Sequence, residues 1–198
     1  MTVASRLVAV SAAQRGQAER IERAFRAAGY ADGTIAAAIV NAYAESALNP
    51  LAVGDAGRSV GLFQLNDRGA GRGYSTAERQ SPDRNIAILL DRERRAIGKV
   101  DAAARAGESV AKLSAMFSTL VERPSATTAA EAYRSALAVR LFPMGATEAA
   151  PGALVPVTVA PAGTPLPGWW RPVAWLSVAI LGGVALFAWP RRGAPSRV

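Results

Sequence analysis

The chain has 198 residues, of which 51% are hydrophobic and 19% are charged, a composition typical of a folded globular protein. It contains neither cysteine nor histidine, which excludes disulfides, a cysteine nucleophile, a Ser-His-Asp triad and the usual zinc sites, so acid–base chemistry must fall to Asp, Glu, Lys, Arg or Tyr. The net charge of +8 is compatible with an anionic partner, but the arginines between Arg15 and Arg140 are interspersed with acids, which favours an ordinary solvated surface.

Two helices are predicted near the N-terminus. Over residues 18–28 apolar side chains recur every three to four positions, which indicates an amphipathic helix that ends at Gly29. A second helix is predicted over 35–47, with Asp32 or Thr34 available as its N-cap. The first apolar run of the chain is short, about seven residues, and continues into a charged helix, so we do not expect a secretory signal.

The middle of the chain predicts a small lobe followed by more helices. In a loop rich in glycine and aspartate, residues 59–66 predict a short strand or a hairpin. Further helices are predicted over 81–106, 108–120 and 126–140. We therefore expect a mainly α fold, in which a helical domain spanning 1–148 carries one small irregular or β-hairpin lobe.

The C-terminal part has a different composition. Residues 149–172 are rich in proline, alanine and glycine and predict an extended linker. Residues 173–190 are apolar and uncharged, with tryptophans at both ends, and as a helix they would cover roughly 25 Å, the short end of what spans a bilayer. We expect a single transmembrane helix there, followed by a basic tail at 191–198.

Glu45 stands at the end of the second predicted helix, after the apolar stretch 38–44 and before Asn49-Pro50. A carboxylate in this position faces the negative end of the helix dipole, and its apolar neighbours would exclude water. Both effects disfavour the charged form, raise the pKa and make the group a suitable proton donor. The alternative is an exposed Glu45 that pairs with a nearby arginine where the helix ends, and the local sequence leaves both open.

Five short motifs follow one another along the chain: Glu45-Ser46, Asn49-Pro50, Gly61-Leu62-Phe63-Gln64, SPDRNIAILL at 81–90 and FSTLVERPS at 117–125. Each alone is weak, since the apolar residues of the tetrapeptide would pack in a core in any case. In this order they resemble the lysozyme-like superfamily of peptidoglycan-cleaving enzymes, in the branch of soluble lytic transglycosylases and phage lysozymes. The resemblance covers roughly residues 18–141 and implies a lysozyme-like fold.

The resemblance also implies a mechanism. Glu45 would be the general acid that protonates the glycosidic oxygen of a glycan strand, after which positive charge develops on the sugar. In the transglycosylase branch the N-acetyl group of the substrate assists, Glu45 also acts as the base, and a 1,6-anhydro sugar is released. No metal or cofactor is required. The chain lacks the Asn-Ala-Gly motif that is common in transglycosylases, which leaves both the anhydro and the hydrolysed product open.

Three acids are candidates for a second carboxylate. Asp55 lies in the glycine-rich loop and Asp67 follows the Gly-Leu-Phe-Gln tetrapeptide, and a turn role is the simpler interpretation of both. The resemblance places Glu122 near the cleft, where it would contact substrate, and the alternative is an ion pair with Arg123 or Arg58.

The remaining candidates would bind substrate. Ser46 would hold the second oxygen of Glu45 or contact the N-acetyl group, and the alternative is a hydrogen bond to its own backbone. Gln64 and Asn66 would offer their amides to the sugars. Tyr133 would stack on a sugar ring, or be an ordinary half-buried tyrosine.

The sequence thus predicts a membrane-anchored enzyme whose partners are peptidoglycan strands and a lipid membrane, with other virion membrane or capsid proteins as further candidates. The phage-like motifs favour a virion protein that aids cell-wall penetration during genome entry. The alternative location is a bacterial inner membrane, where the arginines after 173–190 favour a periplasmic N-terminal domain.

Two other classes of protein were weighed against this one. The first is a catalytically inactive structural or glycan-binding virion protein, and the presence of Glu45 argues against it. The second is a nucleic-acid-binding membrane protein, which would need clustered basic and aromatic residues that the sequence does not show.

Overall fold

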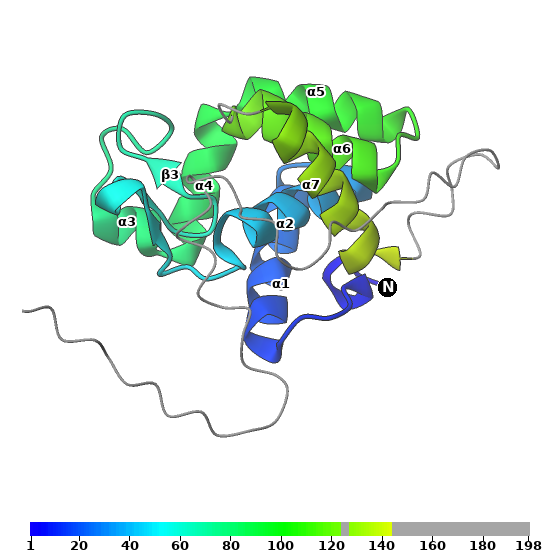
Figure 1. The fold of residues 1–198 in the computed structure, drawn as a ribbon, viewed down its shortest axis with the longest axis horizontal. Helices are drawn as coiled ribbons and strands as arrows, with labels where there is room; N and C mark the ends of the chain where they lie inside the picture. The colour runs from blue at the N-terminus through cyan, green and yellow to red at the C-terminus, as the bar shows by residue number, and fades with distance from the viewer. Residues whose placement is uncertain (124–126, 144–198) are drawn as a thin grey trace, which may run out of the picture. The chain divides into compact units, whose positions relative to one another are not determined.

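The computed structural model describes residues 1–123 and 127–143, which form a helical body with a small lobe beside it (Figure 1). The elements in chain order are η1 (Ala4–Arg6), α1 (Ala12–Ala27), α2 (Asp32–Ser46), β1 (Val53–Gly54), η2 (Asp55–Gly57), β2 (Ser59–Val60), β3 (Leu65–Asn66), α3 (Thr76–Gln80), α4 (Pro82–Arg92), α5 (Arg94–Arg105), α6 (Val110–Phe117), the π-helical η3 (Ser118–Glu122) and α7 (Thr127–Leu141). The prediction of a mainly helical protein with a small hairpin lobe is confirmed.

Helix α2 is the centre of the helical body. Its residues from Thr34 to Ala42 are all buried, and α1, α5, α6 and α7 pack around it (Figure 1). A helix that is apolar on every side must be enclosed in this way, and its many alanines allow the neighbouring helices to come close. The C-terminal end of α2, which carries Glu45, is therefore held by the core of the molecule.

Helix α1 begins earlier than the sequence pattern predicted. Ser11 and Gln14 form a capping box, in which the Ser11 hydroxyl accepts from the backbone of Gln14 and the Gln14 side chain accepts from the backbone of Ser11. The apolar periodicity over 18–28 marks only the part of the helix that reaches the core. The residues before α1 also pack against the body, since the backbone N–H groups of Val3 and Ala4 donate to the buried carboxylate of Glu22.

The prediction of one continuous helix over 81–106 is wrong. The chain leaves helical geometry at Glu93 (φ −108°, ψ 15°), and α4 and α5 are separate helices. The Glu93 side chain is buried there and pairs with Arg123, which follows η3. A tertiary contact thus overrides a sequence pattern that is helical throughout. The predicted helix over 108–120 likewise divides into α6 and the π-helical η3.

The lobe is a three-stranded antiparallel sheet in the order β1-β2-β3, to which the short helix α3 is added. The paired residues are Val53 with Val60, Gly54 with Ser59, Ser59 with Asn66 and Val60 with Leu65. The hairpin predicted over 59–66 is therefore present, while β1 and α3 were not predicted. A capping box between Ser75 and Glu78 starts α3.

Buried polar side chains hold the lobe together. The Asn85 amide, at the start of α4, donates to the carbonyls of Arg79 (2.6 Å) and Val60 (3.3 Å) and accepts from the N–H of Phe63 (3.1 Å). The guanidinium of Arg79 donates to the carbonyls of Arg58 (2.6 Å) and Leu65 (2.7 Å). These bonds supply partners to backbone groups of two very short strands and of the turns beside them.

Within the part of the chain that the structure describes, none of the helices is both long and apolar enough to cross a membrane. The predicted linker (149–172), transmembrane helix (173–190) and basic tail (191–198) all lie outside the described residues.

Gly61 provides a test of how the lobe is held. Its φ is +86°, and an added Cβ would lie 2.1 Å from the Arg79 carbonyl oxygen and 2.3 Å from the Asn85 amide nitrogen. Gly57 has a similar φ of +93° but open space around it. We expect Gly57→Ala to cost about 1–2 kcal/mol of unfolding free energy, from the backbone conformation alone. Gly61→Ala should cost at least twice as much, because the contacts of Arg79 and Asn85 must break. Equal losses in denaturant unfolding of the two variants would contradict this account of the lobe.

Candidate active site

Glu45 lies in the last turn of α2, where the helix ends in an unusual way. Ala47 and Leu48 both adopt left-handed backbone conformations (φ 52° and 58°), and the Ala47 N–H closes the helix on the Tyr43 carbonyl at 2.7 Å. The Glu45 side chain keeps 26% of its surface exposed. It is therefore largely enclosed but still open to a ligand on one side.

The guanidinium of Arg134, in α7, joins the carboxyl groups of Glu45 and Glu122. It donates to Glu45 Oε1, to Glu122 Oε2 (3.0 Å) and to Asn41 Oδ1 (2.9 Å). Asn41 is fixed in turn, because its amide donates to backbone carbonyls of α2 and α6 at 2.8 and 3.1 Å. Arg134 and Glu122 are only 7% and 10% exposed. We call these four residues, contributed by α2, η3 and α7, the carboxyl–arginine cluster.

The charges of the cluster do not balance unless one carboxyl group is protonated. Burial and, after it, the charge of Glu122 raise the pKa of Glu45 to about 8, although the charge of Arg134 lowers it. At neutral pH Glu45 is therefore mainly in its neutral form. A neutral, partly exposed carboxyl group can give its proton to a bound substrate.

A further acid of the lobe acts on Glu45. Asp55, in η2, is exposed, and its charge contributes to the raised pKa of Glu45, which places it near the cluster. Its carboxylate accepts from the Ser59 hydroxyl at 2.5 Å, and the Ser59 oxygen accepts from the Asn66 amide at 3.0 Å. Of the acids considered for a second carboxylate, Asp67 is exposed and has no such influence on Glu45. Asp55 thus lies in the turn that was the simpler interpretation, and its charge makes a small contribution to the pKa of Glu45.

The structure pairs Glu122 differently from the sequence-based alternative. The alternative to substrate contact was an ion pair with Arg123 or Arg58, but Glu122 pairs with Arg134, and Arg123 pairs with Glu93. One oxygen of Glu122 is buried and receives no hydrogen bond from any donor among residues 1–123 and 127–143.

Ser46, Gln64 and Asn66 use their polar groups inside the protein. The Ser46 hydroxyl bonds the carbonyls of Ala42 and Leu62, both at 2.9 Å, so the end of α2 is tied to the lobe. This geometry matches the backbone alternative for Ser46. The Gln64 amide donates to the carbonyls of Ala52 (3.2 Å) and Gly61 (3.0 Å). Their contacts with a sugar stay predictions.

Tyr133 is partly buried and packs against the core at the edge of the cluster. The Arg134 guanidinium lies 5.6 Å from its ring centroid, within the range of a cation–π contact. Stacking of Tyr133 on a sugar ring also stays a prediction.

Two members of the cluster, Asn41 and Arg134, were not identified from the sequence. A signal for each is present. Arg134 shares the buried face of α7 with Ala130 and Leu137, and a charge in an apolar stripe indicates a buried partner of opposite sign. Asn41 interrupts the otherwise apolar run of α2. Neither signal identifies the partner, because Asn41 and Glu45 lie about 90 residues before Arg134 in the chain.

No group of three or more acids within residues 1–123 and 127–143 has the arrangement of a metal site.

A family model described as phage tail lysozyme matches residues 16–144. No curated protein and no solved structure gives a significant match. The match spans more than half of the chain and includes the whole carboxyl–arginine cluster. The chain therefore belongs to the phage tail lysozyme family. This makes it a lysozyme-like phage protein of the glycosidase type that degrades the cell wall.

The raised pKa of Glu45 predicts a pH-dependent stability difference. In the unfolded chain the pKa returns to about 4.5, so the native state holds one more proton between pH 4.5 and 8. The stability contributed by protonated Glu45 is complete below pH 4.5 and is lost as the pH rises through 8. Glu45→Gln, which imitates the neutral form, should therefore gain in Tm relative to the parent by roughly a few degrees at pH 8 and not at pH 4.5.

Thermal unfolding of both proteins across this pH range checks the prediction, with Asp67→Asn as the control for removal of an exposed acid. A Tm difference between Glu45→Gln and the parent that does not change with pH would contradict it.

Proposed function

We propose that the chain cleaves glycosidic bonds of peptidoglycan, as a lytic transglycosylase or a muramidase, with Glu45 as the general acid. The observation that carries the proposal is the neutral, partly exposed carboxyl group of Glu45 at the junction of the helical body and the lobe. Lysozyme-type chemistry needs a carboxylic acid that is still protonated at neutral pH. Burial and the charge of Glu122 supply this state.

The reaction would begin when Glu45 gives its proton to the glycosidic oxygen and the bond from that oxygen to the anomeric carbon breaks. The positive charge on the sugar can be met by the substrate's N-acetyl group or by the carboxylate of Asp55. Glu45 is now an anion, and Arg134 is in place to stabilise it.

In the second half of the reaction Glu45 would act as the base. It takes a proton either from the sugar's own 6-hydroxyl, which then closes the 1,6-anhydro ring, or from a water molecule that attacks the anomeric carbon. Either route returns the proton to Glu45 and leaves the enzyme unchanged.

The other predicted residues would support this chemistry from both sides of Glu45. Glu122 would act on the protonation of Glu45, because the Glu122 carboxylate is itself nearly enclosed and paired with Arg134. Ser46, Gln64 and Asn66 would shape the substrate side of the lobe through backbone contacts and offer their remaining polar capacity to the sugars. Tyr133 would border the sugar chain.

Digestion of purified peptidoglycan by the full chain in detergent tests the enzyme proposal, with released fragments identified by mass. Glu45→Gln should lower the rate on the order of 10²–10⁴-fold, because the variant cannot give up a proton. Asp67→Asn, which removes an exposed acid of the lobe, should keep the parent rate.

The ends of the released fragments distinguish anhydro from hydrolysed products. Retained activity in Glu45→Gln would contradict the role of Glu45. Equal wall binding by parent and variant without cleavage by either would instead favour a glycan-binding structural protein.

We also propose that residues 173–190 anchor the protein in a membrane and that 149–172 serve as a spacer. The support is the sequence alone: an uncharged apolar run with tryptophans at both ends and arginines after it. The phage family favours a virion membrane, and a bacterial inner membrane is the alternative.

In liposome flotation the full chain should rise with the lipid, and a variant without 173–198 should remain in the dense fraction. A variant that lacks only 149–172 should still float. Flotation of the chain without 173–198 would contradict the anchor.

A further inference from the structure

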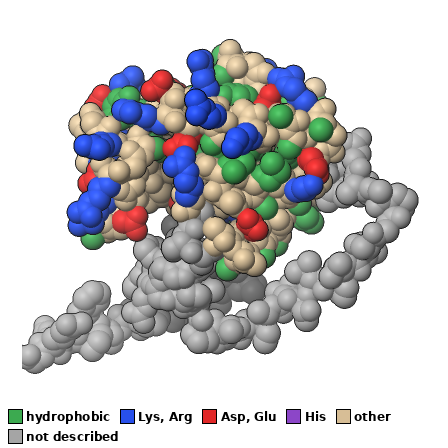
Figure 2. All heavy atoms as spheres, turned by 90° about the horizontal axis from the view of Figure 1, so that it is seen from above, with side chains coloured by type: hydrophobic (Ala, Val, Ile, Leu, Met, Phe, Trp, Pro, Cys, Tyr) green, Lys and Arg blue, Asp and Glu red, His purple; other side chains and the backbone are tan. Residues whose placement is uncertain are grey.

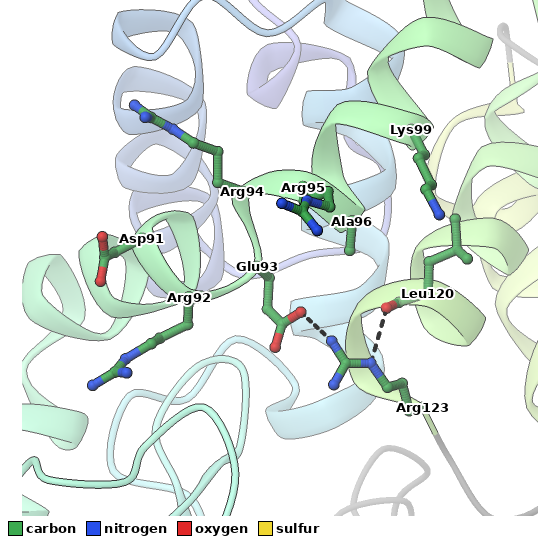
Figure 3. A pocket seen from close by; sticks show the side chains of 9 residues that line it. All are labelled: Asp91, Arg92, Glu93, Arg94, Arg95, Ala96, Lys99, Leu120 and Arg123. Atoms are coloured by element: carbon green, nitrogen blue, oxygen red, sulfur yellow. Dashed lines mark hydrogen bonds and ion pairs between the residues drawn. The ribbon is translucent and has the colours of Figure 1, made fainter.

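A cavity of about 680 Å³ opens between the end of α4, the start of α5 and η3 (Figure 3). Five basic side chains line it, and we call it the basic pocket: Arg92, Arg94, Arg95, Lys99 and Arg123. Two acids, Asp91 and Glu93, also line it, so the lining has a net charge of +3. Figure 3 shows that Arg95, Lys99 and Arg123 lie around Glu93, whereas Arg92 and Arg94 extend away from this group.

The positive charge of the pocket is only partly neutralised within the protein. Glu93 is buried and forms an ion pair with Arg123, which a dashed line marks in Figure 3. Among the described residues, Arg94, Arg95 and Lys99 form no ion pair, and all three are exposed.

Several basic residues elsewhere on the body form ion pairs, for example Arg26 with Asp32 and Arg105 with Asp101. Lys and Arg side chains are prominent over the face seen in Figure 2. Within the described residues, the basic pocket is distinguished by three exposed cations without an ion pair that line the same cavity.

The pocket adjoins the carboxyl–arginine cluster through η3. Glu122, in the cluster, is followed directly by Arg123, in the pocket, and Leu120 of the same segment lines the pocket wall. A polymer bound at Glu45 can therefore have a side group near the pocket. Leu120 and Ala96 add a small apolar surface among the cations. The pocket thus suits a ligand with carboxylates and short alkyl groups, since guanidinium groups bind carboxylates in bidentate fashion.

We propose that the basic pocket binds the carboxylates of the peptide stems that hang from alternate sugars of the glycan strand cleaved at Glu45. These stems carry free carboxylates next to alanine methyl groups, which matches the lining. This inference rests on the proposed function, because it assigns a subsite to the same substrate. With this subsite the protein would bind glycan strands that still carry their peptide stems more tightly than bare glycan.

Binding to soluble fragments tests the proposal without turnover, with the full chain in detergent and the Glu45→Gln substitution present throughout. The probes are a disaccharide with a peptide stem, the same disaccharide without a stem, and the stem form with its carboxylates converted to amides. The pocket variant is Arg95→Gln/Lys99→Gln. The charge-matched control is Arg23→Gln/Lys112→Gln, in which Arg23 is exposed on α1 and Lys112 has only an exposed ion pair with Glu108.

The stem-bearing disaccharide should bind on the order of fivefold more tightly than the other two probes, a preference typical of a few exposed charge pairs. The pocket variant should lose this preference and the control should keep it. Equal binding of all three probes by the parent, or an unchanged preference in the pocket variant, would overturn the proposal.

The same outcomes separate this proposal from the enzymatic one. If the chain with Glu45 intact fails to cleave peptidoglycan while the stem preference is present, the enzyme proposal fails and the pocket stands. If it cleaves peptidoglycan and shows no stem preference, the reverse holds.

Discussion

The guanidinium of Arg134 is the contact on which the active-site geometry depends. It is buried between two carboxyl groups and an amide, and it joins α7 and the neighbouring η3 to α2, which is far away in the sequence. One cation cannot neutralise two largely enclosed carboxylates, which favours a proton on one of them. Glu45 keeps it, because its pKa is the one raised to about 8. The acid needed for glycoside cleavage is thus a consequence of the charge balance in the core.

The active site also requires a lobe that is held in a fixed position against the end of α2. The strands of the lobe have only two residues each, which is too few to be stable alone. Asn85 and Arg79 supply the missing hydrogen bonds from α4 and α3, and Ser46 ties the lobe to the turn that follows Glu45. The residues around Glu45 are therefore occupied mainly with fixing the two halves of the site. Ser46 and Gln64 bond backbone carbonyls for this reason, and their predicted contacts with sugar stay predictions.

The sequence predicted what depends on local pattern and missed what depends on distant contacts. The position of Glu45 at the end of a buried helix follows from the alanine-rich run and the break after it, and the structure agrees. The break at Glu93 could not be predicted from the local pattern, because the buried Glu93 side chain pairs with Arg123, which follows much later in the chain. The pairing of Glu122 with Arg134 was not identified, since Arg134 lies on the next helix and Arg123 is the direct neighbour of Glu122. The resemblance to lysozyme-like enzymes could be found without knowledge of any tertiary contact, because it depends only on the order of the motifs, and the family match supports it.

The central claim is that the charge of Glu122 helps to keep Glu45 protonated at neutral pH. The most direct measurement is the pKa of Glu45 by carboxyl-carbon NMR in the parent and in Glu122→Gln. The account predicts a midpoint about 8 in the parent and a clearly lower one in the variant, because the variant lacks the carboxylate that repels an ionised Glu45 and leaves Arg134 to Glu45 alone. A parent midpoint near 4.5, or the same midpoint in both proteins, would contradict it.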